Sequence, residues 1–400
     1  MHILMIAPEP FFEPRGTPFS EYHRIRALLA LGHTVDLVTY PFGHDVQMPG
    51  LRVFRCVRPP FLTGVGIGPS LAKVPLDLSL AASAARRSLT TRYDVVHSHE
   101  EGAAIGLALS ALLGVPHLYD MHSSLPQQLA NFRFSRSRLL RRAFEVFERA
   151  AVRRSRVVIV ICAELERLVR EIAPGSAPVL IENAPGAGDV SQDGGVAALR
   201  AQFGLADATP LVLYTGTFEP YQGLDLLFDA AVRVHAARPD VRLLLAGGRP
   251  AQIAQAAAAV EARGLSDVVL FAGERPAADI PHFLEAADVL VSPRRLGTNT
   301  PLKIYQYLRA GRVIVATRLL THTQVLDDQV AILTAPTPEA FAEGILSALA
   351  DPRRAAQIGH RAAELARTKY SYDAYLSRTR EAMSRLAAPS AAEPVAGGVA

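Results

Sequence analysis

Short apolar segments alternate with helical segments along almost the whole chain, and this pattern starts twice. In the first half, HILMIA stops at Pro8, a helical stretch ends on Gly32, and later apolar segments lie at 51–54, 94–99, 117–122 and 157–162. In the second half the apolar segments are PLVLYTG, VRLLLAGG, VVLFAG, DVLVSP, VIVAT and AILT, and we predict helices over 224–237, 250–263, 279–287 and 301–310. Strands that alternate with helices in this way predict an α/β fold with doubly wound parallel sheets.

Glycine, proline and small polar residues interrupt the pattern at 184–209, which makes this stretch the best linker candidate. A chain of 400 residues is also long enough for two domains. We therefore expect two Rossmann-like domains facing a central cleft, over 1–185 and 205–370. A helix over 371–388 is expected to return to the first domain, and a tail over 389–400 to be disordered. Ligands of such sheets bind outside the carboxyl ends of the strands, so the loops that follow strands are the places to search.

The composition limits the partners and the compartment. Two distant cysteines, Cys56 and Cys162, fit neither a disulfide framework nor a zinc site, and the N-terminus lacks the pattern of a signal peptide. The apolar run at 157–163 is too short to span a bilayer. We expect a cytoplasmic protein without a cofactor, a metal or a nucleic-acid partner; the net charge of +4 alone is weak support for an acidic partner.

One predicted helix is strongly basic. Between residues 133 and 156 there are nine arginines and two glutamates, with Leu140 and Phe144 among the apolar residues at helical spacing. One interpretation is a solvated helix packed on its own domain. The other is contact with an anionic membrane surface through Arg138, Arg141 and Arg142.

Residues 289–326 contain no aspartate or glutamate, but they contain several arginines and a lysine. Within it, Thr300 suits an N-cap, Pro301 the first helical position and Gly311 the residue after the helix. Lys303 would then lie in the first helical turn, with Arg294 and Arg295 in the loop before it. Phosphate is the anion that such an arrangement suits best.

Other loops after predicted strands hold further candidates. Arg15 and Gly16 precede the first helix, where an anion is favoured, although an ordinary turn with a surface arginine explains them too. Gly216, Gly223 and Gly248 would let a backbone approach a ligand closely.

Two histidines close strands of the first half, His99 in DVVHSH and His122 in HLYDMH. A lone histidine is more often structural than catalytic. Two of them at the carboxyl ends of strands favour a function, although neither has the spacing of a helical metal site.

These motifs together resemble the retaining glycosyltransferases of the GT-B fold, the large group called family 4 or glycosyl transferases group 1. The resemblance rests on SP followed by TPLKIYQYLRAGRVIVAT, preceded by IPHFLEAADVLV, and on RGTP, DVVHSH, YDMH, IENAP, TGTFEPYQGLDLL and AGG in the expected order. It covers nearly the whole chain up to about residue 388. The order of the motifs is specific, whereas any single motif is not.

The resemblance implies a metal-independent enzyme that binds a UDP- or GDP-linked sugar mainly through its second domain. It implies transfer with retention. Together with the basic helix, it leads us to expect a lipid-linked, polysaccharide or other acceptor at the inner face of the plasma membrane. It also assigns roles to residues: His122 near the transferred sugar, Arg15 and Gly16 near the phosphates or acceptor, Gln306 at the ribose, and Lys303 with the amides of Asn299, Thr300 and Pro301 at the diphosphate.

The chain departs from the family at four places. Thr298 and Gln306 replace a pair of acids, and Thr217 and Gln222 replace a pair of bases. An alternative is therefore a degenerate GT-B protein that binds a sugar nucleotide or a partner transferase without turnover. An epimerase or a phosphorylase is a weaker alternative, because each would need residues that the sequence does not show.

Overall fold

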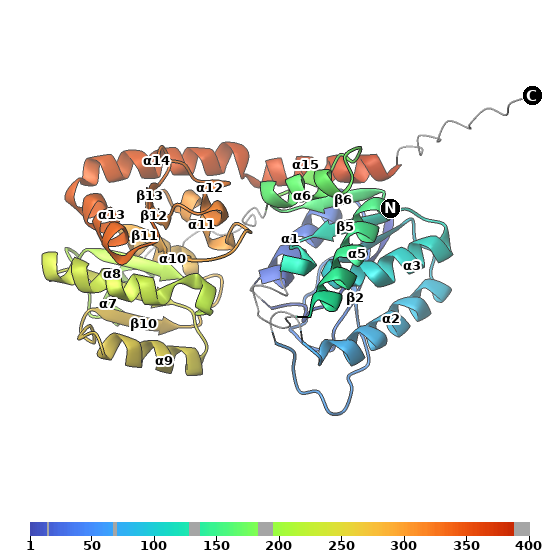
Figure 1. The fold of residues 1–400 in the computed structure, drawn as a ribbon, viewed down its shortest axis with the longest axis horizontal. Helices are drawn as coiled ribbons and strands as arrows, with labels where there is room; N and C mark the ends of the chain where they lie inside the picture. Colours follow the sequence, from blue (N-terminus) through green and yellow to red (C-terminus); the bar gives the residue numbers. More distant parts are fainter. Residues whose placement is uncertain (14–15, 67–69, 128–136, 183–194, 388–400) are drawn as a thin grey trace, which may run out of the picture. The chain divides into compact units, whose positions relative to one another are not determined.

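The computed structural model describes residues 1–13, 16–66, 70–127, 137–182 and 195–387. The chain divides into two compact units (Figure 1). Unit 1 consists of Met1–Ile161, Leu165–Ile181 and the chain from Leu376, and unit 2 of Cys162–Glu164 and Glu182–Tyr375. Most of the C-terminal helix therefore belongs to unit 1, where Arg24 Nη1 donates to Thr379 Oγ1 at 3.2 Å.

Unit 1 is built on a seven-stranded sheet with the strand order β3-β2-β1-β4-β5-β6-β7. All neighbouring strands pair in parallel. The strands are β1 (His2–Ala7), β2 (Thr34–Thr39), β3 (Leu51–Arg55), β4 (Val95–His99), β5 (His117–Met121), β6 (Val157–Val160) and β7 (Val179–Leu180). The strand order reverses direction between β1 and β4, which makes their carboxyl ends the expected ligand edge.

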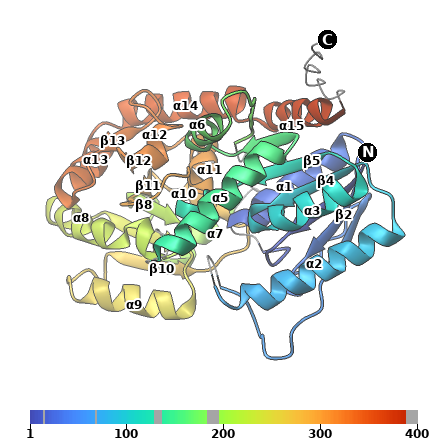
Figure 2. The ribbon, with the colours of Figure 1, turned by 45° about the vertical axis from the view of Figure 1, so that its right-hand side comes forward.

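Helices cover both faces of this sheet. The helical segments are α1 (Gly16–Ala30), α2 (Lys73–Thr90), η1 (Glu100–Gly102), α3 (Ala103–Leu113), α5 (Arg138–Arg154), α6 (Ala163–Ile172) and α15 (Tyr372–Ala387). Figures 1 and 2 show α2, α3 and α5 side by side, and their contacts place them on one face of the sheet. The core on this side contains Leu4, Ile6, Leu76 and Leu80.

Unit 2 repeats the plan with six parallel strands in the order β10-β9-β8-β11-β12-β13. The strands are β8 (Leu211–Thr215), β9 (Arg242–Ala246), β10 (Val269–Gly273), β11 (Val289–Ser292), β12 (Val313–Thr317) and β13 (Ile332–Thr334). The helical segments are α7 (Gly195–Gln202), η2 (Pro220–Gln222), α8 (Leu224–Ala237), α9 (Pro250–Glu261), α10 (Ile280–Ala286), α11 (Leu302–Ala310), α12 (Leu320–Thr323), α13 (Pro338–Ala350) and α14 (Pro352–Lys369). One core packs α8, α9 and α13 on the sheet, and a second packs α7, α10, α11 and α14 on the opposite face.

The predicted fold class, two doubly wound parallel sheets, is confirmed. The linker prediction was wrong at its C-terminal end, because α7 begins at Gly195 and buries Leu199 in the core of unit 2. Its glycine-rich surroundings hid a short apolar repeat at helical spacing. Residues 183–194 of the predicted linker and the tail from residue 388 lie outside the described residues. In the part of the chain that the structure describes, no helix combines the length and apolar character needed to cross a membrane.

Candidate nucleotide-sugar site

At the carboxyl edge of the second sheet, the loops that follow β8 and β9 pack closely against each other and against α11. The strand order reverses at this edge, between β8 and β11. Gly216 follows β8 with φ 129°, and a Cβ there would lie 3.0 Å from Lys303 Nζ. Gly247 follows β9, and a Cβ there would lie 2.0 Å from Gly216 O. Glycine at both positions is therefore required for this packing, which brings the β8 loop against the Lys303 side chain on one side and against Gly247 on the other.

Lys303 is a buried cation at this edge. It lies in the first turn of α11, only 7% of its surface is exposed, and Nζ lies 3.7 Å from the centroid of the Tyr214 ring. Nζ has no hydrogen-bond partner within the described residues. Burial, together with the charge of Arg294, holds the pKa of Lys303 well below its ordinary value. A buried ammonium without a counter-ion is costly, so this position favours an anionic ligand.

Arg294 is the second cation of the site, and its hydrogen-bond partners are all uncharged. Its Nη1 donates to Asn299 O and Thr321 Oγ1, both at 3.0 Å, and its guanidinium carbon lies 5.2 Å from the centroid of the Tyr221 ring. Burial lowers the pKa of Arg294 from its ordinary value. The loop thus fixes the guanidinium in place without neutralising it.

The two neutral replacements in the first loop of unit 2 contact each other. Gln222 Nε2 lies 3.3 Å from Thr217 Oγ1, and Gln222 Oε1 lies 3.5 Å from Arg294 Nε. Thr217 O accepts a hydrogen bond from the Tyr214 hydroxyl at 2.7 Å. Gln222 therefore connects Arg294 to the β8 loop, in the place where the family resemblance leads us to expect a base.

The start of α11 differs from the sequence prediction. Pro301, with φ −64° and ψ 137°, is the N-cap, and the helix begins one residue later than expected, at Leu302. The Thr300 side chain makes no capping hydrogen bond to the helix, so the predicted Thr300 cap was wrong. The extended backbone of Pro301 moves Thr300 one position too far from the first turn. Gly311 ends the helix with φ 66°, as predicted.

The remaining predicted donor residues lie at or near this edge with different surroundings. Gln306 is half-buried one turn after Lys303 on α11, and Asn299 contributes its backbone carbonyl to Arg294. Gly248 has φ 82° and lies against the Phe218 ring. In unit 1, Gly16 is the first residue of α1, and Arg15 lies outside the described residues.

The other cations of the acid-free stretch do not join Lys303 and Arg294. Arg295 forms an ion pair with Asp225 at 2.9 Å, and Arg318 pairs with Asp328. Arg312 Nη2 donates to Glu285 O, and Arg309 is exposed on α11. Folding therefore selects two of the six cations for the site.

In unit 1, His122 belongs to a buried network at the carboxyl ends of β4 and β5. Its Nε2 lies 3.2 Å from His99 Nδ1 and 3.3 Å from Asp120 Oδ1. Burial lowers the pKa of His122 to about 4, although the charge of Asp120 opposes this effect, so His122 is neutral near pH 7. Burial alone would raise the pKa of Asp120, but Arg24, whose Nε lies 2.8 Å from Oδ2, holds it well below its usual range.

His97 completes this network, which sequence reasoning missed. The His97 and His99 rings stack at 4.7 Å, and His97 Nε2 lies 3.5 Å from Asp120 Oδ2. His97, His99 and Asp120 together offer ligand atoms within 4.8 Å of one another, as a metal site would. The fixed charge of Arg24 beside Asp120 opposes a second cation, so we interpret the group as a self-contained ion-pair network. The available signal was the i, i+2 spacing of HSH and DMH on two strands.

Two carboxyl groups at the same edge of unit 1 were also missed. Glu9 follows β1 and Glu100 follows β4; both are buried. Glu100 has φ 46°, which is rare for a residue with a side chain, and accepts a hydrogen bond from Ser123 Oγ at 2.9 Å. Burial and the neighbouring Glu101 charge raise the pKa of Glu100 to about 8. Backbone strain with a perturbed acid is typical of functional positions.

The basic helix α5 exposes the three arginines singled out in the sequence. Arg138, Arg141 and Arg142 are exposed, and Arg141 pairs with Glu145 at 3.0 Å. Leu139 beside them is 81% exposed. These positions leave both interpretations of the helix open.

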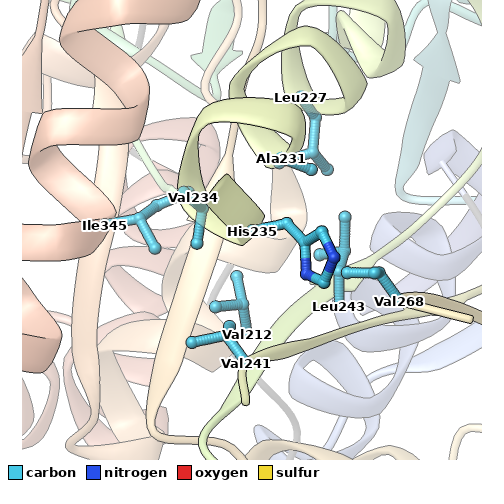
Figure 3. Close-up of a pocket in the computed structure, with 9 residues that line it drawn as sticks. All are labelled: Val212, Leu227, Ala231, Val234, His235, Val241, Leu243, Val268 and Ile345. Atoms are coloured by element: carbon cyan, nitrogen blue, oxygen red, sulfur yellow. The ribbon is translucent and has the colours of Figure 1, made fainter. Parts of the chain in front are cut away.

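A cavity in unit 2 lies at the wrong end of the sheet for a nucleotide. Figure 3 shows its lining, which includes Val212, Val241 and Val268 near the amino ends of three strands, with the His235 imidazole beside them. Its volume is about 20 Å³, room for one water. We therefore regard it as a packing defect of the core.

Comparisons with known proteins agree with this fold. A model described as "Glycosyl transferases group 1" matches residues 209–351, and one described as "Glycosyl transferase 4-like domain" matches residues 22–184. The fold is therefore of the GT-B type, and a glycosyl transferase domain model matches most of each unit.

Two glycosyltransferases are similar to this chain in sequence. The chain is 31% identical to the 2-deoxystreptamine N-acetyl-D-glucosaminyltransferase of Streptomyces fradiae, over 62% of this chain and 61% of that relative's length. It is 26% identical to the phosphatidyl-myo-inositol mannosyltransferase of Mycobacterium tuberculosis H37Rv, over 87% of this chain and 88% of that relative.

Solved structures show the same fold. The sucrose-phosphate synthase from Thermosynechococcus elongatus has a TM-score of 0.77 at 20% identity, covering 96% of this chain and 98% of that one. Anabaena HepE, solved in complex with UDP-glucose, has a TM-score of 0.70 at 19% identity, covering 96% of this chain and 99% of that one.

Proposed function

We propose that the chain transfers a sugar from a UDP- or GDP-linked donor to a lipid-linked or saccharide acceptor, with retention of the anomeric configuration. The observation that carries this proposal is the pair of buried Lys303 and half-buried Arg294 at the reversal point of the second sheet, which have no acidic partner among the described residues. A diphosphate supplies the charge that both side chains lack. The names of the relatives, all transferases, favour turnover over the alternative of a binding protein.

The proposed chemistry follows from these positions. When the bond between the sugar and the diphosphate breaks, negative charge develops on the leaving phosphate. Lys303, Arg294 and the free N–H groups at the start of α11 would stabilise that charge without rearrangement. Two fixed cations take the part that a divalent metal plays in other phosphate sites, and we therefore propose a reaction that tolerates chelators.

In unit 1, we propose that His122 hydrogen-bonds a hydroxyl of the transferred sugar as a neutral imidazole. Its pKa of about 4 argues against proton transfer by this side chain near pH 7. Asp120 and His99 would hold the ring in place through its Nε2 atom. The buried acids Glu9 and Glu100 at the same edge are candidates for contact with the acceptor.

Calorimetric titration with UDP and GDP is the first test. We expect micromolar to millimolar binding of one of them, and Lys303→Ala should weaken it far more than Arg309→Ala, a matched change on the exposed side of the same helix. Absence of binding of both nucleotides at millimolar concentration would disprove the proposal.

A donor screen then tests turnover. UDP- and GDP-sugars are incubated with membrane extract as acceptor, with and without EDTA, and the anomeric configuration of the product is measured by NMR. Binding without transfer or hydrolysis would favour the binding protein instead.

The basic face of α5 supports a second proposal, that Arg138, Arg141 and Arg142 contact anionic lipid. The three side chains are exposed on one helix, and each such charge near an anionic surface contributes about 1 kcal/mol. Sedimentation with anionic vesicles should weaken when Arg141 and Arg142 are changed to Glu. Unchanged sedimentation would leave α5 as a solvated helix.

A further inference from the structure

Four polar side chains of unit 2 are completely buried beside the loop that carries Arg294. Ser292 ends β11, Thr317 ends β12, and Thr321 and His322 lie on α12. Each of them is 0% exposed, and we call them the α12 network. Burial of a polar group costs free energy unless its hydrogen bonds are made. All four side chains make such bonds, and the bonds converge on Arg294.

His322 is the centre of the α12 network. Its Nδ1 lies 2.8 Å from Thr317 O and 3.2 Å from Thr317 Oγ1, and its Nε2 lies 2.8 Å from Ser292 Oγ. A carbonyl oxygen can only accept, so Nδ1 carries the proton and Nε2 accepts from the serine hydroxyl. Burial, together with the charges of Arg294 and Lys303, lowers the pKa of His322 to about 3, although the bond to the backbone carbonyl opposes this. The imidazole is therefore neutral near pH 7.

This tautomer sets the direction of the Thr317 hydroxyl. A protonated Nδ1 cannot accept a hydrogen bond, so the Thr317 hydroxyl does not donate to His322. It donates instead to Arg294 O at 2.7 Å. The backbone of Arg294 is thus tied to the end of β12 through a side chain that His322 orients.

The residue before His322 holds the other end of Arg294. Arg294 Nη1 donates to Thr321 Oγ1 at 3.0 Å, and Thr321 Oγ1 donates to Asn299 O at 2.6 Å. Gly297 leaves room for this contact, because a Cβ there would lie 3.2 Å from Arg294 Nη1. Two successive residues of α12 therefore act on both the backbone and the guanidinium of Arg294.

All four side chains of the α12 network are uncharged near pH 7. A carboxylate in place of any of them would pair with the guanidinium and weaken its attraction for a second anion. A neutral imidazole and three hydroxyls fix the direction of the guanidinium and leave its charge available to a ligand.

We infer that His322 is a positioning residue for Arg294, acting through the Thr317 hydroxyl and through its chain neighbour Thr321. It keeps the guanidinium oriented before a ligand arrives, so that less side-chain entropy is lost when a diphosphate binds. The contribution to diphosphate binding rests on the proposed function. The order that the α12 network gives to Arg294 does not, and it can be measured without a ligand.

Hydrogen exchange of the Arg294 Nε–H, followed by NMR on the full chain with isotope-labelled arginine, measures this order. Arg294→Lys assigns the signal. His322→Leu removes both ring nitrogens, and we expect exchange to become about tenfold faster, as for the loss of one hydrogen bond. His322→Asn keeps a donor near the position of Nδ1 and should restore slow exchange. His235→Leu, at the amino end of the same sheet, is the matched control and should change nothing.

A double-mutant cycle on nucleotide binding separates positioning from a general loss of structure. His322→Leu should weaken the binding of UDP or GDP by about tenfold, but by less than about twofold in the Arg294→Ala background. Thr321→Val, which removes one hydroxyl at nearly unchanged volume, should behave in the same way, and Thr321→Ser should restore binding. Circular dichroism and the thermal midpoint check that each variant is folded, and the Thr321 pair decides if His322→Leu does not fold.

Two results would overturn the inference. The first is a folded His322→Leu or Thr321→Val chain in which the Arg294 Nε–H exchanges as slowly as in the wild type. The second is an equal weakening of nucleotide binding with and without the Arg294 side chain, which would make the α12 network purely structural. A wild-type chain that binds neither nucleotide would instead disprove the proposed function, and the exchange of Arg294 would still decide the inference.

Discussion

The carboxyl edges of the two sheets hold buried charges of opposite organisation. In unit 1, Arg24 pairs with Asp120 at 2.8 Å, and three histidines surround that pair. In unit 2, the buried Lys303 feels the charge of the half-buried Arg294, whose hydrogen-bond partners are uncharged groups. Arg24 and Asp120 at the first edge neutralise each other, whereas Lys303 and Arg294 at the second have no anionic partner among the described residues. The same sheet topology therefore supplies a fixed platform in one unit and a charged binding site in the other.

The largest effect is expected from breaking the ion pair at the first edge. Arg24→Ala leaves Asp120 buried without its counter-charge and removes the bond to Thr379, so we expect a loss of about 3–5 kcal/mol in the free energy of unfolding of unit 1. Urea unfolding measures it, with Arg141→Ala in the exposed pair with Glu145 as the control, expected to cost about 0.5 kcal/mol or less.

A double variant checks the physical reason. Arg24→Met with Asp120→Leu removes both charges and should recover most of the lost stability, because an apolar pair of similar volume replaces the ion pair. If Arg24→Ala costs less than 1 kcal/mol, the edge of unit 1 is not held by this pair.

Lys303→Met tests the second edge, and it should change binding and stability in opposite directions. Loss of the ammonium should weaken nucleotide binding by about a hundredfold, or about 3 kcal/mol. The free protein should instead become more stable, because a buried charge without a partner is removed. Calorimetry and thermal unfolding of the same sample measure both quantities, and Arg309→Met is the control.

The sign of the pH dependence follows from the lowered pKa of Lys303. The unfolded chain takes up the proton near the ordinary value of 10.5 and the folded chain only at lower pH, so stability is lost as the pH falls below 10.5. Lys303→Met should remove this loss, and bound UDP or GDP should oppose it. If the wild type and Lys303→Met lose the same stability between pH 10 and pH 7, the site already has a counter-charge.

Glu100→Gln probes a strained acid at the first edge. Its folded pKa of about 8 lies above the ordinary 4.5, so the folded chain binds the proton more tightly and stability is lost as the pH rises from 4.5 to 8. The neutral variant should therefore be more stable than the wild type at pH 9, by up to about 5 kcal/mol, and equal at pH 4. Unfolding at both values measures this, and an equal difference at both would exclude titration of Glu100 as its source.

Features of these edges that depend on neighbouring residues in the sequence could be predicted, whereas contacts between distant residues could not. The strands, Gly311 and the place of Lys303 in the first turn of α11 follow from local patterns, and so they could be predicted. The pairing of Arg24 with Asp120 could not, because it joins α1 to β5 across a sequence separation of 96 residues. Likewise, only folding separates Lys303 and Arg294 from Arg295 and Arg318, which find acids elsewhere.

The smallest effect is expected at Gln306. A glutamate there would add an acid near the cations of the second edge, as Asp120 stands beside Arg24 at the first. Gln306 lies one turn after Lys303 on α11 and replaces the acid that the family resemblance leads us to expect there. Gln306→Glu should bind the ribose hydroxyls through a charged acceptor and tighten UDP or GDP binding by about 1 kcal/mol, or about fivefold. Gln306→Met should weaken it by a similar amount, and competition calorimetry resolves both changes. Weaker binding of the glutamate variant would contradict this prediction. It would mean that the diphosphate, and not the ribose, lies next to position 306, where a carboxylate would repel it.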